Sequence, residues 1–286
     1  MKKLAVCLHL YDLSQTEDFL EKINHIKEAD IPFDLFISVS NAAAFQKKQI
    51  SVVSKITQLY PDAVIIPTPN AGYDIGPFIE ILHHIDLNQY SYILKLHTKR
   101  REKISYAKLN RKRYDTALWR KILLNELIGS KEIVLSNIEE LNKNDTIGMI
   151  GPTPLIVEEK NELTEFAQCA ASLGLSLTEP LTFVAGTMFF IKSSLLKPFL
   201  NYQISDFAPT EAAIHDKTLA HTMERMFGLA VTAQKHQIKG VSYHNYQLES
   251  LRASIRRFFI QKRHTSKGKL IIKVFMIPVY IKKASK

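Results

Sequence analysis

The sequence predicts an α/β protein in which a mostly parallel sheet is flanked by helices. Short apolar segments alternate with segments whose apolar residues recur every three or four positions, beginning at the N-terminus. Strands that alternate with helices of this length pair in parallel, because each helix carries the chain back to the same end of the sheet. In addition, 46% of the 286 residues are hydrophobic, which is enough to bury a large core.

The first four strands are predicted from short apolar runs at Leu4–Leu10, Phe33–Val39, Ala63–Ile66 and Tyr90–Leu96. Each of the first three is followed by apolar side chains at helical spacing, which predict helices containing Phe19, Leu20, Ile23 and Ile26, then Phe45, Val52, Val53, Ile56 and Leu59, then Phe78, Ile79, Leu82 and Ile85. The segment from Ser14 to Glu17 has the capping-box pattern that marks a helix start.

The second half of the chain follows the same pattern less regularly. Helical spacing and cap residues predict helices at Trp119–Ile128, Ile133–Leu141, Leu163–Leu173 and Thr210–Phe227. Gly174 is expected to end the third of these helices. Strands are predicted at Ile147–Ile150 and at Phe183–Ile191, the latter interrupted by Ala185-Gly186.

The formal charge of +10 is concentrated at the C-terminal end. Residues 250–286 contain 11 of the 38 Lys and Arg residues and none of the 28 Asp and Glu residues. The rest of the chain is close to neutral, which argues against a nucleic-acid groove in the body and for a tail that contacts an anionic surface. The two cysteines provide neither a disulfide framework nor a metal site, which fits a reducing cytoplasm. No apolar run approaches the roughly 20 residues of a membrane-spanning helix.

Two predicted strand ends carry residues suited to a ligand. Residues 67–78, PTPNAGYDIGPF, follow the third strand and combine turn-forming residues with Asp74, and the fourth strand ends in a basic run at residues 97–101. Ligands of parallel sheets bind at the carboxyl ends of strands, so the carboxylate could hold a ribose and the cations a diphosphate. The alternative is that Asp74 only caps the next helix and that the basic run is a solvated strand end. Neither GxxxxGK[ST] nor GxGxxG is present, so ordinary P-loop and dinucleotide sites are excluded.

Two later segments also carry candidate chemistry. Gly186 lies within the apolar segment FVAGTMFF, where a glycine marks a bulge, the close approach of a ligand, or simply tight packing. Residues 209–228 place several ionisable side chains on one predicted helix and its approach, namely Glu211, His215, Asp216, His221, Glu224 and Arg225. They lack the HExxH spacing of a zinc site, so a carboxylate general base or an ion-paired helix face is favoured over a metal.

Taken in order, segments spanning roughly residues 3–235 resemble the rhamnan synthesis protein F family of bacterial polysaccharide glycosyltransferases. The segments are AVCLHLYD, FDLFISV, NAGYDIGPF, YILKLHTKR, LWRKILLNELIG, IGMIGPTP, FVAGTMFFIKSSLLKPF and TEAAIHDKTLAHTMERMFG. One departure is Tyr73, because the family usually carries Arg or a similar residue at that position.

The resemblance implies transfer of a sugar from a nucleotide-diphosphate donor to a growing, lipid-linked cell-surface polysaccharide, in a GT-A-like, Rossmann-type fold. It implies a glycosyltransferase domain at 1–235, with a nucleotide-sugar-binding half at 1–101 and an acceptor and catalytic half at 102–235. The charge distribution predicts that residues 236–286 form a basic amphipathic tail. The implied donor-binding residues are His9, Asn70, Gly72, Asp74, His97, Lys99 and Arg100. The implied acceptor-binding residues are Gly186, Thr187, His215, His221, Glu224 and Arg225.

The resemblance also bears on the chemistry of transfer. GT-A enzymes usually have an Asp-x-Asp that holds a divalent cation where this chain has His97-Thr98-Lys99. Side-chain cations can neutralise a leaving diphosphate where metal ligands are missing, so no metal cofactor is expected. An inverting transfer needs a base to accept the proton of the attacking hydroxyl. Order along the chain favours Asp216 as this catalytic base and keeps Glu211 as the alternative.

Lys and Arg residues surround Phe258–Ile260 and the apolar cluster within Leu270–Ile281, a composition suited to an anionic membrane surface. The protein is therefore expected on the cytoplasmic, inner face of the cell membrane; the alternative is that these apolar residues complete its core. A non-catalytic scaffold of a polysaccharide assembly complex is the second functional hypothesis, and a nucleic-acid partner is disfavoured. The transferred sugar, rhamnose or another hexose such as galactofuranose, and the oligomeric state remain open.

Overall fold

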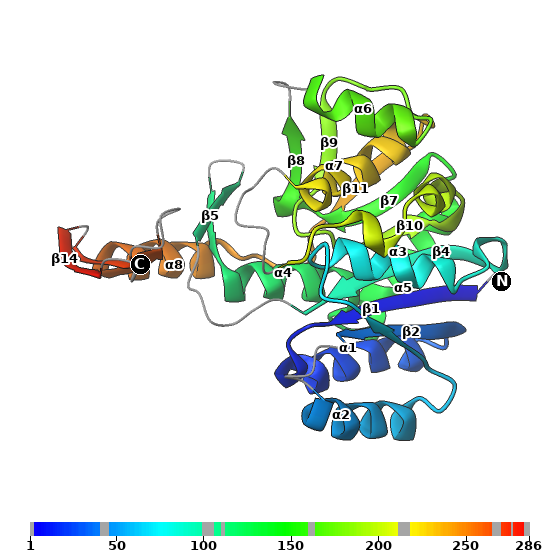
Figure 1. The fold of residues 1–286 in the computed structure, drawn as a ribbon, viewed down its shortest axis with the longest axis horizontal. Helices are drawn as coiled ribbons and strands as arrows, with labels where there is room; N and C mark the ends of the chain where they lie inside the picture. Colours follow the sequence, from blue (N-terminus) through cyan, green and yellow to red (C-terminus); the bar gives the residue numbers. More distant parts are fainter. Residues whose placement is uncertain are drawn as a thin grey trace.

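A seven-stranded sheet, with strand order β11-β7-β10-β4-β1-β2-β3, forms the centre of the computed structural model (Figure 1). Its strands are β1 (Lys3–Leu10), β2 (Phe33–Ser40), β3 (Val64–Thr68), β4 (Tyr90–His97), β7 (Ile147–Pro152), β10 (Phe189–Lys192) and β11 (Gln237–Val241). The structure describes residues 3–40, 46–98, 106–109, 112–159, 164–210, 218–264, 270–275 and 277–282.

Strand direction in this sheet agrees with the prediction. β1 pairs in parallel with β2 and β4, β2 pairs in parallel with β3, and β11 pairs in parallel with β7. Only β10 runs against its neighbours, β4 and β7. The predicted α/β fold with a mostly parallel sheet flanked by helices is therefore confirmed.

Helices cover both faces of the sheet (Figure 1). One face is covered by α1 (Thr16–Glu28), α2 (Gln46–Leu59), α4 (Thr116–Ile128) and α5 (Lys131–Lys143), and the other by α3 (Ile75–His83), α6 (Thr164–Ser172) and α7 (Leu219–Thr232). Side chains alternate along a strand, so β1 supplies both cores: Leu4, Val6, Leu8 and Leu10 to the first, and Ala5 and Cys7 to the second.

Phe227 of α7 links the elements that cover the second face. Its buried ring packs against Phe78 of α3 and Phe189 of β10, each with ring centroids 5.6 Å apart. A third ring, Phe199 in the 3₁₀ segment Ser193–Asn201, lies 4.6 Å from it. This aromatic cluster fixes α7 beside α3, and both helices contribute to the site described below.

The segment predicted as one interrupted strand, Phe183–Ile191, forms two strands in different sheets. β9 (Leu181–Val184) pairs with β8 (Ile156–Glu159), whereas β10 joins the main sheet. Gly186 and Thr187 lie between them with φ of 89° and 50°. This left-handed backbone turns the chain out of the strand, which an apolar sequence pattern does not reveal.

Two predicted helix starts were also wrong. The helix expected from Thr210 begins at Leu219, after an extended Thr218. Thr210 instead donates its backbone N–H to the carbonyl of Asn70 at 2.9 Å. The capping box does not form at α1 either, because Gln15 is the N-cap and makes no side-chain cap bond, while Asp12 caps the short 3₁₀ turn before it.

The sheet continues past the predicted domain boundary at residue 235. β11 pairs with β7, and Val241 and Tyr246 are buried in the core. The chain is held there by the buried Glu126, whose carboxylate accepts from the ring and the backbone N–H of His244 at 2.9 and 3.2 Å. Burial of these apolar side chains places this part of the predicted tail in the body.

The described residues from Gln247 onward form an arm that extends from one end of the body (Figure 1). The arm consists of α8 (Gln247–Phe259) and an antiparallel sheet of β12 (Ile260–His264), β13 (Leu270–Val274) and β14 (Ile277–Lys282). At its base, α8 contacts the hairpin of β5 (Tyr106–Leu109) and β6 (Lys112–Asp115). Within the described residues, no helix combines the length and apolar character needed to cross a membrane.

Candidate active site

The carboxyl ends of β1 and β4 meet at the centre of the sheet. These strands are neighbours, and His9 near the end of β1 is the register partner of His97 at the end of β4. From β1 the chain continues outward through β2 and β3, whereas β4 lies on the other side of β1. Such a reversal of strand order leaves a crevice outside the strand ends, which is where open α/β sheets bind ligands.

Two pockets lie at this position. The first, called here the β1–β4 pocket, has a volume of about 210 Å³ and is lined by His9, Tyr11, Asn70, Tyr73, Asp74, His97, Thr98 and Thr210. The second, called the α7 pocket, has a volume of about 240 Å³ and is lined by Tyr73, Asp74, Ile75, Trp119, Gly186, Thr187, Ala220, His221 and Glu224. Tyr73 and Asp74 line both pockets, so these two residues form a wall shared by the two cavities.

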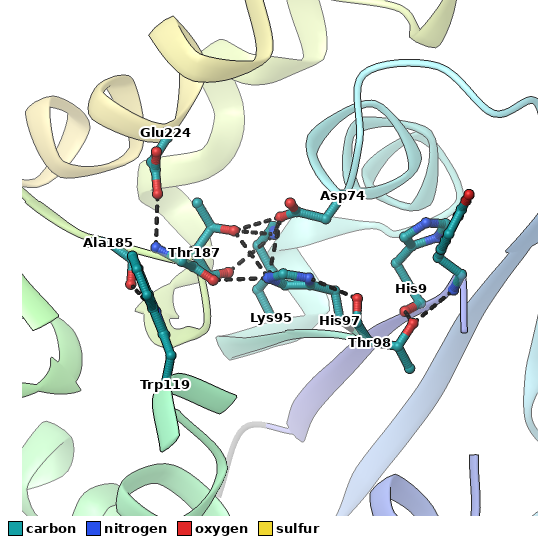
Figure 2. Close-up of polar contacts among 11 residues, drawn as sticks. His9, Asp74, Lys95, His97, Thr98, Trp119, Ala185, Thr187 and Glu224 are labelled. Carbon is teal, nitrogen blue, oxygen red and sulfur yellow. Dashed lines mark hydrogen bonds and ion pairs between the residues drawn. The ribbon is translucent and has the colours of Figure 1, made fainter. Parts of the chain in front are cut away.

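Asp74 is held by a buried cation. The Lys95 ammonium donates to its carboxylate at 2.6 Å, the Thr187 hydroxyl donates to the same oxygen, and His97 Nε2 lies 3.5 Å from it (Figure 2). Asp74 occupies the N-cap position of α3 but makes no side-chain cap bond. The helix-cap interpretation of Asp74 is therefore wrong, because its carboxylate points to Lys95.

Lys95 is 1% exposed although it carries a charge. Besides Asp74, its ammonium donates to the carbonyl and the hydroxyl of Thr187 at 3.0 and 3.1 Å, and it lies 5.2 Å from the ring centroid of Phe78. Without such partners, the buried ammonium would lower the free energy of unfolding by roughly several kcal/mol, because its lost hydration would not be replaced. The pairing therefore ties β4 to the start of α3 and to the turn after β9.

Two further residues at the strand ends hold loops in place. His97 Nε2 donates to the carbonyl of Gly186 at 2.8 Å. The Thr98 hydroxyl accepts from the backbone N–H groups of Tyr11 and Asp12 at 2.8 and 2.9 Å. The chain that leaves β1 and the turn that precedes β10 are therefore both fixed to the end of β4 (Figure 2).

His9 is a neutral wall of the β1–β4 pocket. It is buried, and its Nδ1 lies 2.9 Å from the hydroxyl of Ser38. Burial lowers the pKa of His9 from 6.5 to about 4, and the neighbouring charge of Asp74 offsets only part of that effect. At pH 7 His9 can therefore offer a hydrogen bond to a ligand but not a positive charge.

The loop that carries Asp74 is shaped by the segment opposite it. Gly72 has φ of 70°, and a Cβ there would lie 2.7 Å from the ring of Phe207. Tyr73 also has positive φ, 55°, and its N–H donates to the Thr210 hydroxyl at 3.2 Å. Gly72 is absent from the residues that line either pocket, and its packing on Phe207 accounts for a glycine at this position. Its predicted contact with a donor stays a prediction.

Glu224 and its neighbours form the far wall of the α7 pocket. Its carboxylate accepts from the Gly186 N–H at 2.8 Å and from Arg225 at 2.9 Å. Arg225 also pairs with Glu159 at 2.8 Å and lies over the ring of Phe183. Arg225 is therefore occupied by two carboxylates and lies outside the pocket lining, behind Glu224.

The structure brings together most of the predicted site residues that it describes. His9, Asn70, Asp74 and His97 line the β1–β4 pocket, and Gly186, Thr187, His221 and Glu224 line the α7 pocket. Five predicted residues lie outside the described residues: Lys99, Arg100, Glu211, His215 and Asp216.

Sequence reasoning missed Lys95, Thr98 and Trp119. Lys95 carries a recognisable signal, since it is the one charged residue within the apolar strand YILKLH and alternation places it on the same face as His97. Thr98 and Trp119 carry no comparable signal, because their roles depend on chain segments far away in the sequence. Within the described ranges, no group of three His, Cys, Asp or Glu side chains could hold a metal ion, and the expected metal independence stays a prediction.

The fold and the two pockets define a class: an α/β protein with a mostly parallel sheet and two adjoining pockets at the carboxyl ends of its central strands. Comparison with known sequences then identifies the family. The profile of the rhamnan synthesis protein F family matches residues 1–236, and this chain belongs to that family.

Individual relatives are more distant. The chain is 27% identical over 248 residues to the uncharacterized protein WxcX of Xanthomonas campestris pv. campestris, an alignment that covers 83% of this chain and 32% of WxcX. The chain thus spans about a third of the length of this relative.

The structure was also compared with solved structures, and the similarities found are partial. S. aureus TarS 1-349 in complex with UDP is 12% identical with a TM-score of 0.43, over 89% of this chain and 63% of TarS. Glucosyl-3-phosphoglycerate synthase from Mycobacterium tuberculosis, in complex with Mn2+, UDP and phosphoglyceric acid, is 11% identical with a TM-score of 0.33, over 99% of this chain and 89% of the synthase.

The two members of the buried ion pair are expected to be energetically coupled, so that removing both costs less than the sum of the two single losses. Lys95→Met leaves the Asp74 carboxylate without its cation, and Asp74→Asn leaves a buried ammonium without its anion. Each should lower the free energy of unfolding by about 3 kcal/mol. The double variant should lose clearly less than the sum, as measured by urea unfolding in a double-mutant cycle.

The matched control is the exposed pair Lys55–Glu17. Lys55→Met should change the free energy of unfolding by less than about 1 kcal/mol, since both partners are solvated. Additive losses for Lys95→Met and Asp74→Asn would contradict a coupled pair.

Proposed function

We propose that this chain is a glycosyltransferase of polysaccharide synthesis, which moves a sugar from a nucleotide-diphosphate donor to a growing glycan. The observation that carries the proposal is the pair of pockets that share the Tyr73–Asp74 wall. Group transfer requires two ligands held next to each other, and adjacent pockets that share the lining residues Tyr73 and Asp74 support that arrangement. Membership of a family named for rhamnan synthesis supports a polysaccharide as the product.

The β1–β4 pocket is the proposed donor site. It lies at the reversal of strand order, where parallel sheets bind nucleotides, and its lining offers hydrogen-bonding groups from His9, Asn70 and Thr98. Asp74 would bind ribose hydroxyls, which a carboxylate accepts well. Rhamnose remains the first candidate for the transferred sugar, with galactofuranose or another hexose as alternatives.

Transfer is proposed to proceed without a metal ion. The leaving nucleoside diphosphate needs positive charge, and β4 ends in His97, after which the sequence continues with Thr98, Lys99 and Arg100. Lys95 contributes less of this charge, because Asp74 already neutralises it at 2.6 Å. The cations that follow β4 would therefore replace a metal at the diphosphate.

The base that activates the acceptor is proposed to be Asp216, with Glu211 as the alternative. Thr210, which directly precedes the segment holding both carboxylates, lines the β1–β4 pocket. Ala220 and His221, which follow the segment, line the α7 pocket. The described residues on either side of this segment thus line the two pockets, which supports the proposal that one of its carboxylates acts at the reacting atoms.

The arm is proposed to bind the anionic inner face of the cell membrane, where a lipid-linked acceptor would be found. On α8, Leu248, Leu251, Ile255 and Phe259 recur on one helical face and are each 46 to 56% exposed. Phe275, Ile277 and Val279 add exposed apolar groups from the small sheet. The sequence around them is strongly basic, so apolar insertion and charge attraction would act together.

Donor turnover tests the proposed activity. Nucleoside diphosphates should raise the melting temperature, and incubation with a labelled deoxythymidine-diphosphate rhamnose or uridine-diphosphate hexose plus a lipid-linked glycan should transfer the label. Excess chelator should leave the rate unchanged. Activity that returns only with Mn²⁺ or Mg²⁺ would refute metal independence, and a chain that neither binds nor turns over any donor would be a scaffold instead.

The two candidate bases are separated by matched amide variants. Asp216→Asn should lower the rate of transfer by at least about 100-fold, since it removes the proton acceptor, while nucleotide-induced thermal stabilisation remains. Glu211→Gln should retain most activity in the same assay. The reverse pattern would assign the base to Glu211.

Membrane binding by the arm is testable with point variants that leave the body intact. Leu251→Glu with Ile255→Glu should abolish cosedimentation with vesicles rich in phosphatidylglycerol, because two charges would have to enter the apolar region. Ile50→Glu is the control, since Ile50 is 73% exposed on α2 and outside the arm. Unchanged sedimentation of the double variant would rule out the arm as the contact.

A further inference from the structure

The lining of the α7 pocket includes Trp119, an aromatic side chain that the proposed function does not yet use. Trp119 lies near the start of α4 and faces the cavity together with Glu224 and Thr187 (Figure 2). We propose that the α7 pocket binds a neutral sugar ring of the acceptor glycan and that Trp119 is the platform on which the ring lies. This inference rests on the proposed transferase function and names the ligand of its second pocket.

The indole is held in one orientation. Its Nε1 donates to the carbonyl of Ala185 at 3.3 Å. A Cβ at Gly186 would lie 2.6 Å from that nitrogen, so only glycine lets the ring pack this closely against the turn. The turn itself is fixed by the hydrogen bonds from His97 to Gly186 and from Gly186 to Glu224. A ligand would therefore meet a preorganised aromatic surface, which lowers the cost of ordering on binding.

Polar groups of the pocket are equally well fixed. Glu224 is held by the Gly186 N–H and by Arg225, and His221 Nδ1 lies 2.8 Å from the Thr218 hydroxyl. A sugar ring presents an apolar C–H face and an edge of hydroxyl groups. An aromatic ring complements the face, while a carboxylate, an imidazole and a hydroxyl complement the edge.

The charges in the pocket favour a neutral ligand over a nucleotide. Two carboxylates, Asp74 and Glu224, belong to its lining. The guanidinium of Arg225, next to Glu224 in the chain, is already shared between Glu224 and Glu159 at 2.9 and 2.8 Å. Because Asp74 is paired with Lys95 and Glu224 with Arg225, neither cation is left for a diphosphate, and the described residues of the lining include no Lys or Arg. Hydroxyl groups can still donate to both carboxylates.

The route to the pocket fits a glycan that extends toward the arm. Trp119 follows shortly after β6, and β6 contacts both α4 and α8 at the base of the arm. Figure 1 shows α4, the hairpin and α8 in succession along the same end of the molecule. A sugar on Trp119 would thus lie between the shared Tyr73–Asp74 wall and the arm.

Trp119 is the single tryptophan of the 286 residues, so its fluorescence reports on this pocket directly. Titration with neutral trisaccharides, a rhamnose trisaccharide among them, should produce a saturable change in emission, and uridine or deoxythymidine diphosphate should produce none. A saturable change with the nucleoside diphosphates alone would overturn the inference and assign the pocket to the nucleotide. No change with any trisaccharide would also overturn it.

Variants separate stacking from a structural role. Trp119→Ala should weaken trisaccharide binding, measured by calorimetry, by about tenfold or more, and Trp119→Phe should stay within about threefold of the natural chain because a ring is retained. Tyr92→Ala, which removes a partly buried ring near the start of β4, should leave trisaccharide binding unchanged. Equal affinity of Trp119→Ala and the natural chain would refute the platform.

Measuring nucleotide binding separates a failure of this inference from a failure of the proposed transferase function on which it rests. Thermal stabilisation by nucleoside diphosphates should be the same in Trp119→Ala and the natural chain, which also shows that the variant is folded. Intact nucleotide binding and donor turnover without a trisaccharide response would refute only the sugar platform. If the natural chain neither binds nucleoside diphosphates nor turns over a donor, the proposed transferase function itself is refuted.

Discussion

The buried pair of Lys95 and Asp74 is the interaction on which the rest of the site depends. An ammonium that is 1% exposed must have partners, and these include the carboxylate at the start of α3 and Thr187 in the turn before β10. Satisfying one lysine therefore positions three segments that are far apart in the sequence. Asp74 lines both pockets, so its pairing with Lys95 also fixes the position of the boundary that the two pockets share.

The parallel sheet makes this arrangement possible. Helical crossovers return each strand to the same end, so the carboxyl ends of β1 and β4 lie side by side and His9 meets His97 in register. The antiparallel β10 then enters beside β4 and brings the Gly186–Thr187 turn to the same edge. Left-handed backbone at that turn and at Tyr73 orients the walls of the α7 pocket, an example of local strain held by surrounding contacts at a candidate site.

Charge is divided among three places with different roles. Asp74 and Lys95 neutralise each other inside the protein, and Arg225 is shared by Glu159 and Glu224, so neither cation is available to a phosphate in the α7 pocket. The excess positive charge of the chain lies instead in residues 250–286, a sequence segment that also contributes Leu251, Ile255 and Phe259 to the exposed apolar face of α8. Separate placement of these charges is consistent with a neutral glycan in the pocket and an anionic surface at the arm.

The sequence by itself determined the repeating order of strands and helices, the mostly parallel sheet, the family, and the candidate loop with Asp74, because these follow from periodicity and from residues close together in the chain. It also carried the signal for Lys95, a charge inside an apolar strand. Tertiary structure alone decided that Asp74 pairs with Lys95 rather than capping α3, that Phe183–Ile191 turns at Gly186, and that Trp119 faces the α7 pocket. Each of these depends on groups 20 or more positions away, such as Lys95 to Asp74 or Trp119 to Ala185, and local sequence patterns carry no information about which distant groups will meet.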